Sequence, residues 1–265
     1  MKLTAENYYS IEANQEYLSV SQYKDFCGSL GKLACEAEAM AKIRGEWEIR
    51  KTTPLLVGSY VDSYFEGTLP KFKQDNPEVF TQKGDLKSNF RKAEEIIERV
   101  EKDDFFMLSL SGEKQVIMTA KMFGAKWKVK MDSYLPGKAI VDLKVMSSLR
   151  KQHYTKDFGY MDFTQYWGYD LQGAVYQEVV FQNTGHRLPF YIAAVSKEEE
   201  PDIEVIQIDN KHLQEKLYEI EQNTQKIIGL KKGLYSPIRC ELCDYCKHTK
   251  ILTKPIHFSE LLGEV

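Results

Sequence analysis

Three consecutive β-like runs in the middle of the chain place the strongest limit on its fold. They cover residues 114–123, 125–134 and 138–146, and Gly124 and the pair Pro136–Gly137 separate them. Glycine and proline at such positions favour tight turns, so the runs predict an antiparallel meander. Because strand-like runs recur near residues 188–196 and 203–209, we expect the meander to begin a larger mixed sheet.

The segments around these strands have helical periodicity. The order of helices and strands predicts an α/β fold, in which helices flank a central mixed β-sheet and an N-terminal helical extension precedes it. We expect a single domain over 1–265, with a helical part at 1–50 and a cysteine-containing tail at 235–265. The predicted helices cover residues 21–27, 31–43, 54–66, 86–110 with a break near Asp103, 166–185 and 210–233, and the predicted loops cover 69–84 and the aromatic-rich stretch before residue 166.

Composition limits the class of protein. A chain of 265 residues that is 43% apolar can form a substantial core, and a net charge of −3 excludes a uniformly basic protein. No run approaches the roughly 18 apolar residues that cross a bilayer, and the first residues lack an apolar leader. We therefore expect a soluble cytoplasmic protein without a membrane partner.

The run Val141–Val145 contains an acid and a lysine two residues apart. Side chains alternate across a strand, so Asp142 and Lys144 share the face opposite Val141, Leu143 and Val145. A pair of this kind is common on a solvated strand face, which is the simpler interpretation.

A second aspartate favours a functional interpretation of that pair. If Pro136–Gly137 closes a hairpin, Asp132 lies on the strand adjacent to Asp142 and faces the same way. Two neighbouring carboxylates repel each other unless a cation lies between them, and a hard divalent ion with oxygen ligands fits. Lys144 would then lie beside a metal ion, as metal-assisted phosphodiester hydrolysis requires.

These residues resemble the PD-(D/E)XK nuclease superfamily, in which an acid precedes a (D/E)-x-K strand by ten to twenty residues. The RecB-like branch adds Q-x-x-x-Y on the following helix, and Gln172 and Tyr176 match it. That branch also has G-x-x-x-H on an upstream helix, where this chain has Gly58 and then Asp62 in place of histidine. In length and in its aromatic run, the chain is most similar to phage RecE-like exonucleases.

The resemblance implies a restriction-endonuclease-like core and a metal-dependent deoxyribonuclease. Asp132, Asp142 and Lys144 would be catalytic. One or two Mg²⁺ or Mn²⁺ ions would bind Asp62, Asp132, Asp142 and the backbone carbonyl of Leu143, with Glu66 as an alternative to Asp62. Gln172 and Tyr176 would contact DNA or support the site.

Further basic residues have roles that the sequence leaves open. Lys126, Lys128 and Lys130 either contact phosphates or prevent edge pairing of the strand. A 5′-phosphate pocket could use Arg44, Arg91 or Arg150, and nothing in the sequence selects among them.

The resemblance also implies a substrate and partners. The substrate would be linear double-stranded DNA, digested 5′ to 3′ to leave 3′ single-stranded overhangs for phage-type recombination. The partners would be a RecT-like single-strand annealing protein and further copies of this chain in a homo-oligomeric ring. The alternatives are a RecB-like nuclease of other polarity or single-strand preference with an iron–sulfur cluster, and an inactive DNA-binding or assembly protein.

Three of the five cysteines form a compact motif near the end of the chain. Cys240, Cys243 and Cys246 follow a C-x-x-C-x-x-C spacing, which favours free thiols or a metal centre over an extracellular disulfide framework. Several RecB-like nucleases hold a [4Fe–4S] cluster with one early cysteine and three late ones. The resemblance implies Cys27 as the fourth ligand, with Cys35 as the less favoured alternative and zinc or free thiols as other outcomes.

Overall fold

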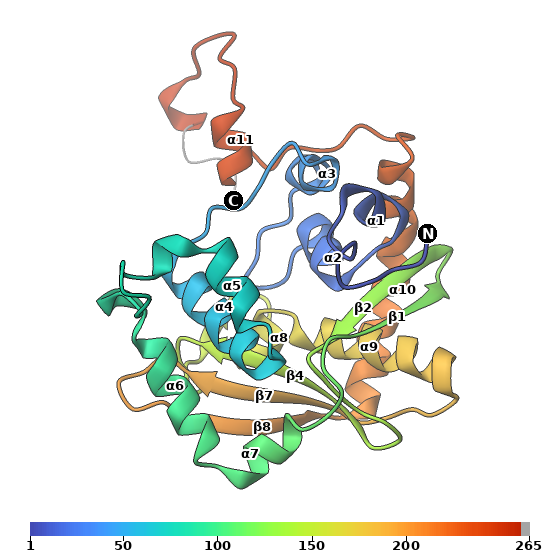
Figure 1. Ribbon diagram of the computed structural model, residues 1–265. Helices are drawn as coiled ribbons and strands as arrows, with labels where there is room; N and C mark the ends of the chain where they lie inside the picture. Colours follow the sequence, from blue (N-terminus) through green and yellow to red (C-terminus); the bar gives the residue numbers. More distant parts are fainter. Residues whose placement is uncertain (261–265) are drawn as a thin grey trace.

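The computed structural model describes residues 1–260, so the last five residues of the predicted 235–265 tail lie outside the described residues. A four-stranded mixed sheet occupies the centre, in the order β3–β4–β7–β8 (Figure 1). The β4–β7 pair is parallel, whereas β3–β4 and β7–β8 are antiparallel. The predicted fold class is thereby confirmed. The strands are β3 (Ser133–Leu135), β4 (Ala139–Met146), β7 (Phe190–Ser196) and β8 (Ile203–Ile208).

The predicted meander is split between two sheets. Strands β1 (Val116–Met122) and β2 (Ala125–Met131) pair only with each other among the named strands, and they form a two-stranded ribbon. Asp132 separates β2 from β3, so the chain leaves one sheet and enters the other at this residue. The change of sheet lets Trp127, Val129 and Met131 pack in the core, where each is fully buried.

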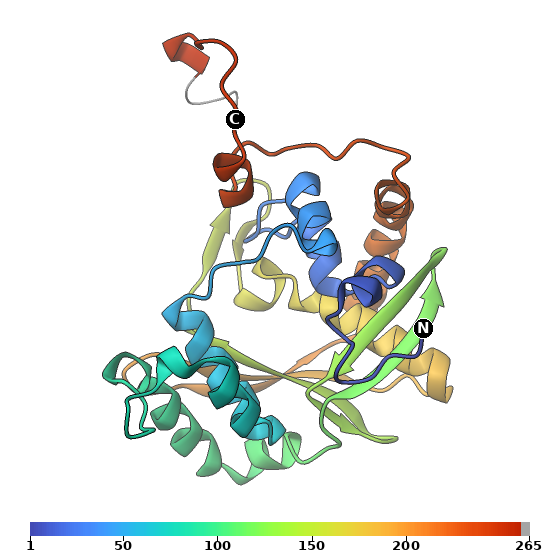
Figure 2. The same ribbon diagram turned by 45° about the horizontal axis from the view of Figure 1, so that its top comes forward.

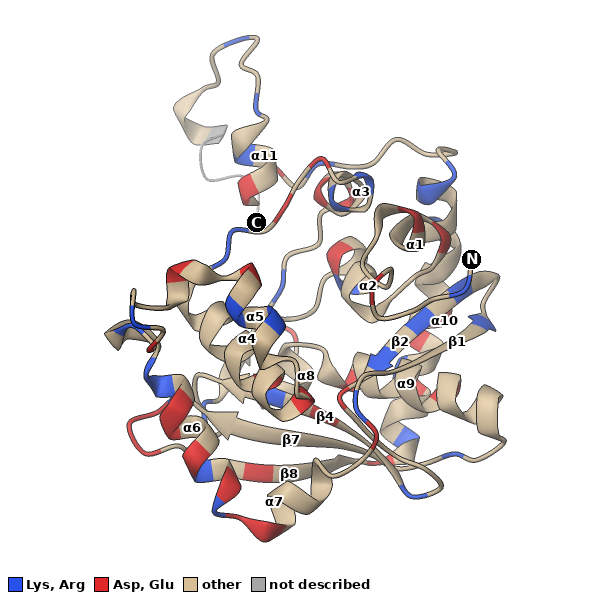
Figure 3. Ribbon diagram, in the orientation of Figure 1, with Lys and Arg blue, Asp and Glu red and all other residues tan. Residues whose placement is uncertain are grey.

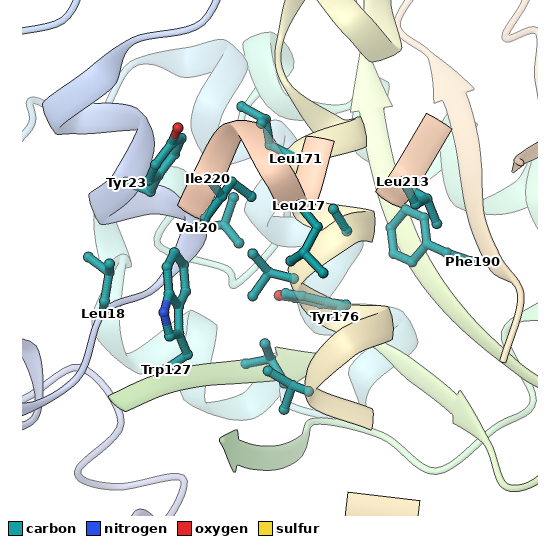
Figure 4. Packing of buried hydrophobic residues seen from close by; sticks show 14 of the residues in the cluster. Leu18, Val20, Tyr23, Trp127, Leu171, Tyr176, Phe190, Leu213, Leu217 and Ile220 are labelled. Carbon is teal, nitrogen blue, oxygen red and sulfur yellow. The ribbon is translucent and has the colours of Figure 1, made fainter. Parts of the chain in front are cut away.

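Each face of the central sheet is covered by helices. One face packs against α4 (Thr53–Glu66), α6 (Lys92–Glu101) and α7 (Asp104–Ser109), and the other against α9 (Tyr169–Thr184), α10 (Asn210–Lys231) and the β1–β2 ribbon (Figure 2). Alternation in β4 sends Val141 and Leu143 to the first face and Ile140 to the second. Figure 4 shows the second core, where Tyr176 and Leu171 of α9 lie among residues from α2, β2 and α10.

Most predicted helices are present, with three differences. The helix predicted at 31–43 is α3 (Glu36–Arg44), because Cys35 caps its start and residues 28–35 form turns. The loop predicted at 69–84 contains α5 (Leu69–Asp75), since Pro70 lies in its first turn, where proline favours a helix. The aromatic-rich loop contains a hairpin and a short helix. Further short elements are η1 (Pro77–Val79), η2 (Ser88–Phe90), β5 (His153–Thr155), β6 (Gly159–Met161), α8 (Phe163–Tyr166), α11 (Asp244–His248) and η3 (Phe258–Glu260).

Several contacts fix the N-terminal segment against the rest of the molecule, and the backbone of β2 and the end of α10 provide two of them. Leu18 lies between α1 (Ile11–Glu16) and α2 (Val20–Cys27) and exchanges backbone hydrogen bonds with β2 on either side of Trp127. At the end of α10, the ammonium of Lys231 donates to the carbonyl oxygens of Asn14 and Tyr17 at 2.9 and 2.7 Å. The segment therefore forms a wall beside β2.

Candidate active site

The two aspartates of the motif meet where the chain passes between sheets. The register pairs Ser133 with Val141, so Asp132 lies opposite Asp142. An oxygen of Asp132 accepts a hydrogen bond from the backbone N–H of Leu143 at 3.0 Å. Asp142 is only 2% exposed. The motif is therefore not on a solvated strand face, and the simpler interpretation of the sequence is wrong for this strand.

Lys144 lies on the same face of β4 and forms an ion pair with Asp142. Its ammonium nitrogen also lies 3.2 Å from the carbonyl oxygen of Leu143. Burial alone would lower the pKa of Lys144, but the carboxylates of Asp142 and Asp132 raise it above its usual value. The lysine is therefore held as a cation beside the acids.

Asp62 approaches the same place from α4, which packs on β4. One of its carboxylate oxygens is buried without a hydrogen-bond partner among residues 1–260. Burial, opposed by the nearby ammonium of Lys144, raises the pKa of Asp62 to about 7. Glu66 follows one turn later and accepts a hydrogen bond from Thr68 at 3.2 Å. An unpartnered buried oxygen among other acids is suited to a cation, so the donor set fits a divalent metal ion.

Helix α9 contacts both β4 and β2 through its Q-x-x-x-Y motif. The side-chain amide of Gln172 donates to Asp142 at 2.5 Å, which orients that carboxylate. One turn later, the hydroxyl of Tyr176 donates to the backbone carbonyl of Lys130 at 3.1 Å. Both side chains therefore support the site, and Tyr176 does so from within the core, where it is 9% exposed.

These residues line one cavity of about 260 Å³, and the opposite wall of that cavity is basic and hydroxylic. Figure 3 marks the lysine positions of β2 in blue. Lys128 and Lys130 of β2 were candidates from the sequence, but the sequence did not identify the N-terminal part of this wall, whose residues lie beside β2 because Leu18 pairs with that strand. The wall is formed by Tyr8, Tyr9, Ser19, Ser21, Lys24, Lys128 and Lys130.

The three candidate arginines do not line this cavity. Arg150, for example, is exposed and forms ion pairs with Asp202 and Glu204. A larger hollow of about 780 Å³ lies beside residues 27–34 and the β5–β6 hairpin. It lacks Asp62, Asp132, Asp142 and Lys144, so the chemistry belongs to the smaller cavity.

Comparison with known proteins agrees with this geometry. A family model described as a PDDEXK-like domain of unknown function matches residues 19–249. The chain belongs to this PDDEXK-like family. No curated protein matches the chain.

A solved relative has the same fold over its whole length. It is a protein from Eubacterium rectale, described as a "putative exonuclease", whose crystal structure was determined at 2.19 Å resolution. The two chains are 60% identical, the match covers 100% of each, and the TM-score is 0.97. The predicted superfamily is thereby confirmed, and the two comparisons support a nuclease.

The PDDEXK-like chain also carries a second cluster of ligand atoms, far from the acids in sequence. The sulfur atoms of Cys35, Cys240, Cys243 and Cys246 all lie within 4.8 Å of one another. Cys246 is 3.6 Å from Cys35 and 3.9 Å from Cys240. Cys27 is exposed and is not part of the cluster, so the structure brings Cys35 to the tail instead. The reason is local, since Cys35 caps α3 and α3 contacts α11, whereas Cys27 ends α2.

Backbone N–H groups point at several of these sulfurs. Cys243 donates to the sulfur of Cys240 at 3.3 Å, and Cys246 donates to that of Cys243 at 3.4 Å. Burial opposes ionisation of Cys240, but the backbone N–H groups of Leu242 and Cys243 and the thiols of Cys243 and Cys35 lower its pKa to about 7. The described residues contain no disulfide, so all four thiols are free to bind a metal.

No helix among residues 1–260 is both long enough and apolar enough to cross a bilayer.

Proposed function

We propose that this protein is a Mg²⁺-dependent exonuclease that hydrolyses phosphodiester bonds of linear double-stranded DNA. The observation that carries the proposal is the convergence of Asp62, Asp132 and Asp142 with Lys144 on one cavity. A buried carboxylate oxygen of Asp62 has no hydrogen-bond partner among the described residues, and an oxygen of Asp142 is partnered there only by the ion pair with Lys144. Membership of the PDDEXK-like family and the description of the Eubacterium rectale relative as a "putative exonuclease" support the same reaction class.

The acids would hold one or two Mg²⁺ or Mn²⁺ ions. Asp132, Asp142 and the carbonyl of Leu143 are the ligands from the strands, and Asp62 is the ligand from α4. Asp62 is preferred to Glu66 because its free oxygen is buried, whereas Glu66 already accepts the hydroxyl of Thr68. When bound, such ions lower the pKa of water and stabilise charge on a phosphate.

The protein's own groups complete the site. Lys144, held as a cation by Asp142 and Asp132, would orient the attacking water and offset the charge that develops on the phosphate. Gln172 fixes the orientation of Asp142. On the opposite wall, Lys24 and the hydroxyls of Ser19 and Ser21 offer donors to DNA phosphates.

The polarity and the partners rest on the resemblance to RecE-like exonucleases. We propose 5′-to-3′ digestion that leaves 3′ single-stranded overhangs. We also propose a homo-oligomeric ring around DNA and delivery of the overhang to a RecT-like annealing protein.

A digestion assay tests these proposals. Linear duplex labelled at either the 5′ or the 3′ end is incubated with the wild-type protein in Mg²⁺, with EDTA and closed circular duplex as controls. We expect rapid loss of a 5′ label, a surviving complementary strand, and no digestion with EDTA or of the circle. Loss of a 3′ label first would reverse the polarity, cutting of the circle would indicate an endonuclease, and no digestion at all would favour an inactive DNA-binding protein.

We further propose that Cys35, Cys240, Cys243 and Cys246 bind a structural metal. Zinc bound by four cysteines has Zn–S bonds of about 2.3 Å, and a tetrahedron of that size has sulfurs roughly 3.8 Å apart. The Cys35–Cys246 and Cys240–Cys246 sulfur separations of 3.6 and 3.9 Å match this edge. A [4Fe–4S] cluster binds each thiolate to a different iron and needs more room, so the distances favour a single ion.

Metal analysis of the protein purified without oxygen distinguishes the two centres. We expect about one zinc per chain and no colour. Four irons per chain with brown colour would show an iron–sulfur cluster, and absence of both metals would show free thiols.

A further inference from the structure

The three lysines of β2 lie on the same face of the strand, because they are two residues apart, but their environments differ. Lys126 is exposed and forms an ion pair with Glu16 at 2.6 Å. Lys128 is 1% exposed and donates to the side chain of Asn14 at 2.8 Å and to the backbone carbonyl of Tyr8. The first two lysines therefore fix the N-terminal segment to the strand.

Lys130 differs from both. Among residues 1–260 its ammonium has no hydrogen bond and no ion pair, and it lines the cavity of about 260 Å³ beside the acids. Its neighbours are two aromatic rings, with the nitrogen 4.8 Å from the ring centre of Tyr9 and 5.7 Å from that of Tyr8. The hydroxyl of Tyr176 holds the backbone of Lys130 in place. The carboxylates of Glu66 and Asp62 lie near enough to be affected by its charge, but neither forms an ion pair with it among the described residues, so the ammonium can contact a phosphate.

Tyr9 supplies an aromatic surface on the wall of the same cavity. It is 69% exposed, although Tyr8 next to it is 6% exposed and packs edge-on against it at 4.9 Å. The backbone around Tyr9 is not free, because the side chain of Asn14 donates to its carbonyl at 3.2 Å and Lys128 binds the carbonyl of Tyr8. An exposed ring on a fixed backbone is suited to stacking on a nucleobase.

We propose that Lys130 and Tyr9 form a nucleotide subsite beside the catalytic acids. Lys130 binds a backbone phosphate next to the scissile one, and the open face of Tyr9 stacks on the base of a neighbouring nucleotide. The subsite takes DNA without regard to sequence, because phosphates and base faces are common to all nucleotides. This inference rests on the proposed nuclease function and adds to it the position of the strand in the cavity.

The stacking of Tyr9 on a base is tested by a thermodynamic cycle that combines substitutions of Tyr9 with removal of bases from the DNA. DNA binding by the wild type, Tyr9→Leu and Tyr9→Phe is measured by fluorescence anisotropy in Ca²⁺. The substrates are a normal linear duplex and one with abasic nucleotides at the end of the digested strand. We expect Tyr9→Leu to weaken binding of the normal duplex by roughly 5- to 150-fold and to have no effect on the abasic duplex. Tyr9→Phe restores binding. An equal loss on both substrates would overturn the stacking contact.

The phosphate half is tested by the dependence of binding on salt. Lys130→Ala removes one phosphate contact, so the slope of log affinity against log salt becomes shallower by about 1. Lys126→Ala is the matched control, because it removes a lysine of the same strand that lies outside the cavity. If Lys130→Ala and Lys126→Ala have the same slope, Lys130 does not bind phosphate.

These experiments distinguish failure of the nucleotide subsite from failure of the nuclease function on which it rests. Failure of the wild-type protein to digest DNA would contradict the nuclease. Digestion by the wild type, together with variants of Lys130 and Tyr9 that bind DNA as the wild type does, would contradict the subsite alone.

Discussion

The acid-lined cavity and the four-cysteine cluster are two candidate metal centres that the chain builds in different ways. The acids come from β4, from the junction between β2 and β3, and from α4, all within the main packed body. The cysteines come from the start of α3 and from the short α11 region, which packs on the body through few buried residues. The first centre is positioned by a core that forms for other reasons, whereas the second must itself hold its segments together.

Because the two centres are built differently, loss of the metal ion should have different consequences at each. Carboxylates and a carbonyl favour hard ions that exchange with solvent, and thiolates favour softer ions that stay bound. We therefore expect removal of the first ion to abolish chemistry with little effect on the fold, and removal of the second to loosen the tail with a smaller effect on chemistry.

Substitution of Lys144 by alanine is expected to have the largest effect on activity. Among residues 1–260 the lysine is the cation that pairs with Asp142 inside the cavity, so its loss should slow digestion of linear duplex by about 10²- to 10⁴-fold. The initial rate of nucleotide release at saturating DNA measures this effect. Thermal unfolding of the variant serves as the folding control, and a rate close to that of the wild type would exclude Lys144 from the chemistry.

Substitution of Cys35 by serine should disrupt the four-cysteine centre. We expect loss of the tail metal and a melting temperature lower by several degrees, because binding energy of the metal contributes to folding. Metal content and thermal unfolding are the measurements. Cys27→Ser is the matched control, since this exposed thiol lies outside the cluster. Equal effects of the two serine variants would contradict the assignment of Cys35.

Substitution of Gln172 by alanine should have an intermediate effect confined to the acid centre. Removal of the hydrogen bond to Asp142 leaves that carboxylate less well oriented, so Mn²⁺ affinity should fall about 10- to 100-fold. Calorimetric titration with Mn²⁺ measures it. Gln182→Ala on the same helix is the control, because Gln182 bonds to Glu178 at the surface. Unchanged Mn²⁺ affinity in Gln172→Ala would count against the orienting role.

Lys128 should have a smaller effect, a contribution to the stability of the fold that depends on pH. Burial lowers its pKa in the folded protein to about 8, below the value of 10.5 for the exposed side chain. Between these values the unfolded chain binds more protons, so the contribution of Lys128 to the free energy of unfolding increases with pH. The gain is at most about 1.4 kcal/mol per pH unit.

Denaturant unfolding of the wild type and Lys128→Met from pH 7 to pH 10 measures this contribution. The stability of the wild type relative to Lys128→Met should increase over that range. Lys24, whose pKa is also lowered to about 8, is present in both proteins and cancels. The pKa of Lys231 is lowered to about 8 by burial and in part by the charge of Lys128, so Lys231 adds to the same pH-dependent difference. Lys126→Met is the control, and a pH-independent difference for Lys128→Met would show that the ammonium is not desolvated.

The sequence was most informative where chemistry depends on local spacing. Alternation along β4 and the turn at Pro136–Gly137 were sufficient to predict that Asp142 faces Asp132, because strand register follows from the hairpin. The spacing of Gln172 and Tyr176 likewise predicted two side chains on one face of a helix. The separate β1–β2 ribbon was not predictable, because the residue at which a chain changes sheets depends on long-range packing.

Contacts between segments that are distant along the chain could not be predicted from the sequence either. Nothing near Tyr9 or Leu18 indicates that these residues pack beside β2, and nothing near Cys27 or Cys35 decides which of the two meets the tail. Both outcomes depend on how helices dock in three dimensions. Burial of Lys128 was missed for the same reason, since the sequence suggested contact with phosphates or protection of a strand edge for this lysine, and the N-terminal segment instead covers it.

The contact between Lys231 and the N-terminal segment has a consequence for biosynthesis. Ribosomes make the wall that carries Tyr9 and Ser19 first, but the ammonium that binds the carbonyls of Asn14 and Tyr17 comes from the end of α10. A nascent chain therefore lacks one anchor of this wall until Lys231, 214 residues after Tyr17, has been synthesised. A chain assembled in this order completes its acid-lined cavity only after the core that supports the cavity is available.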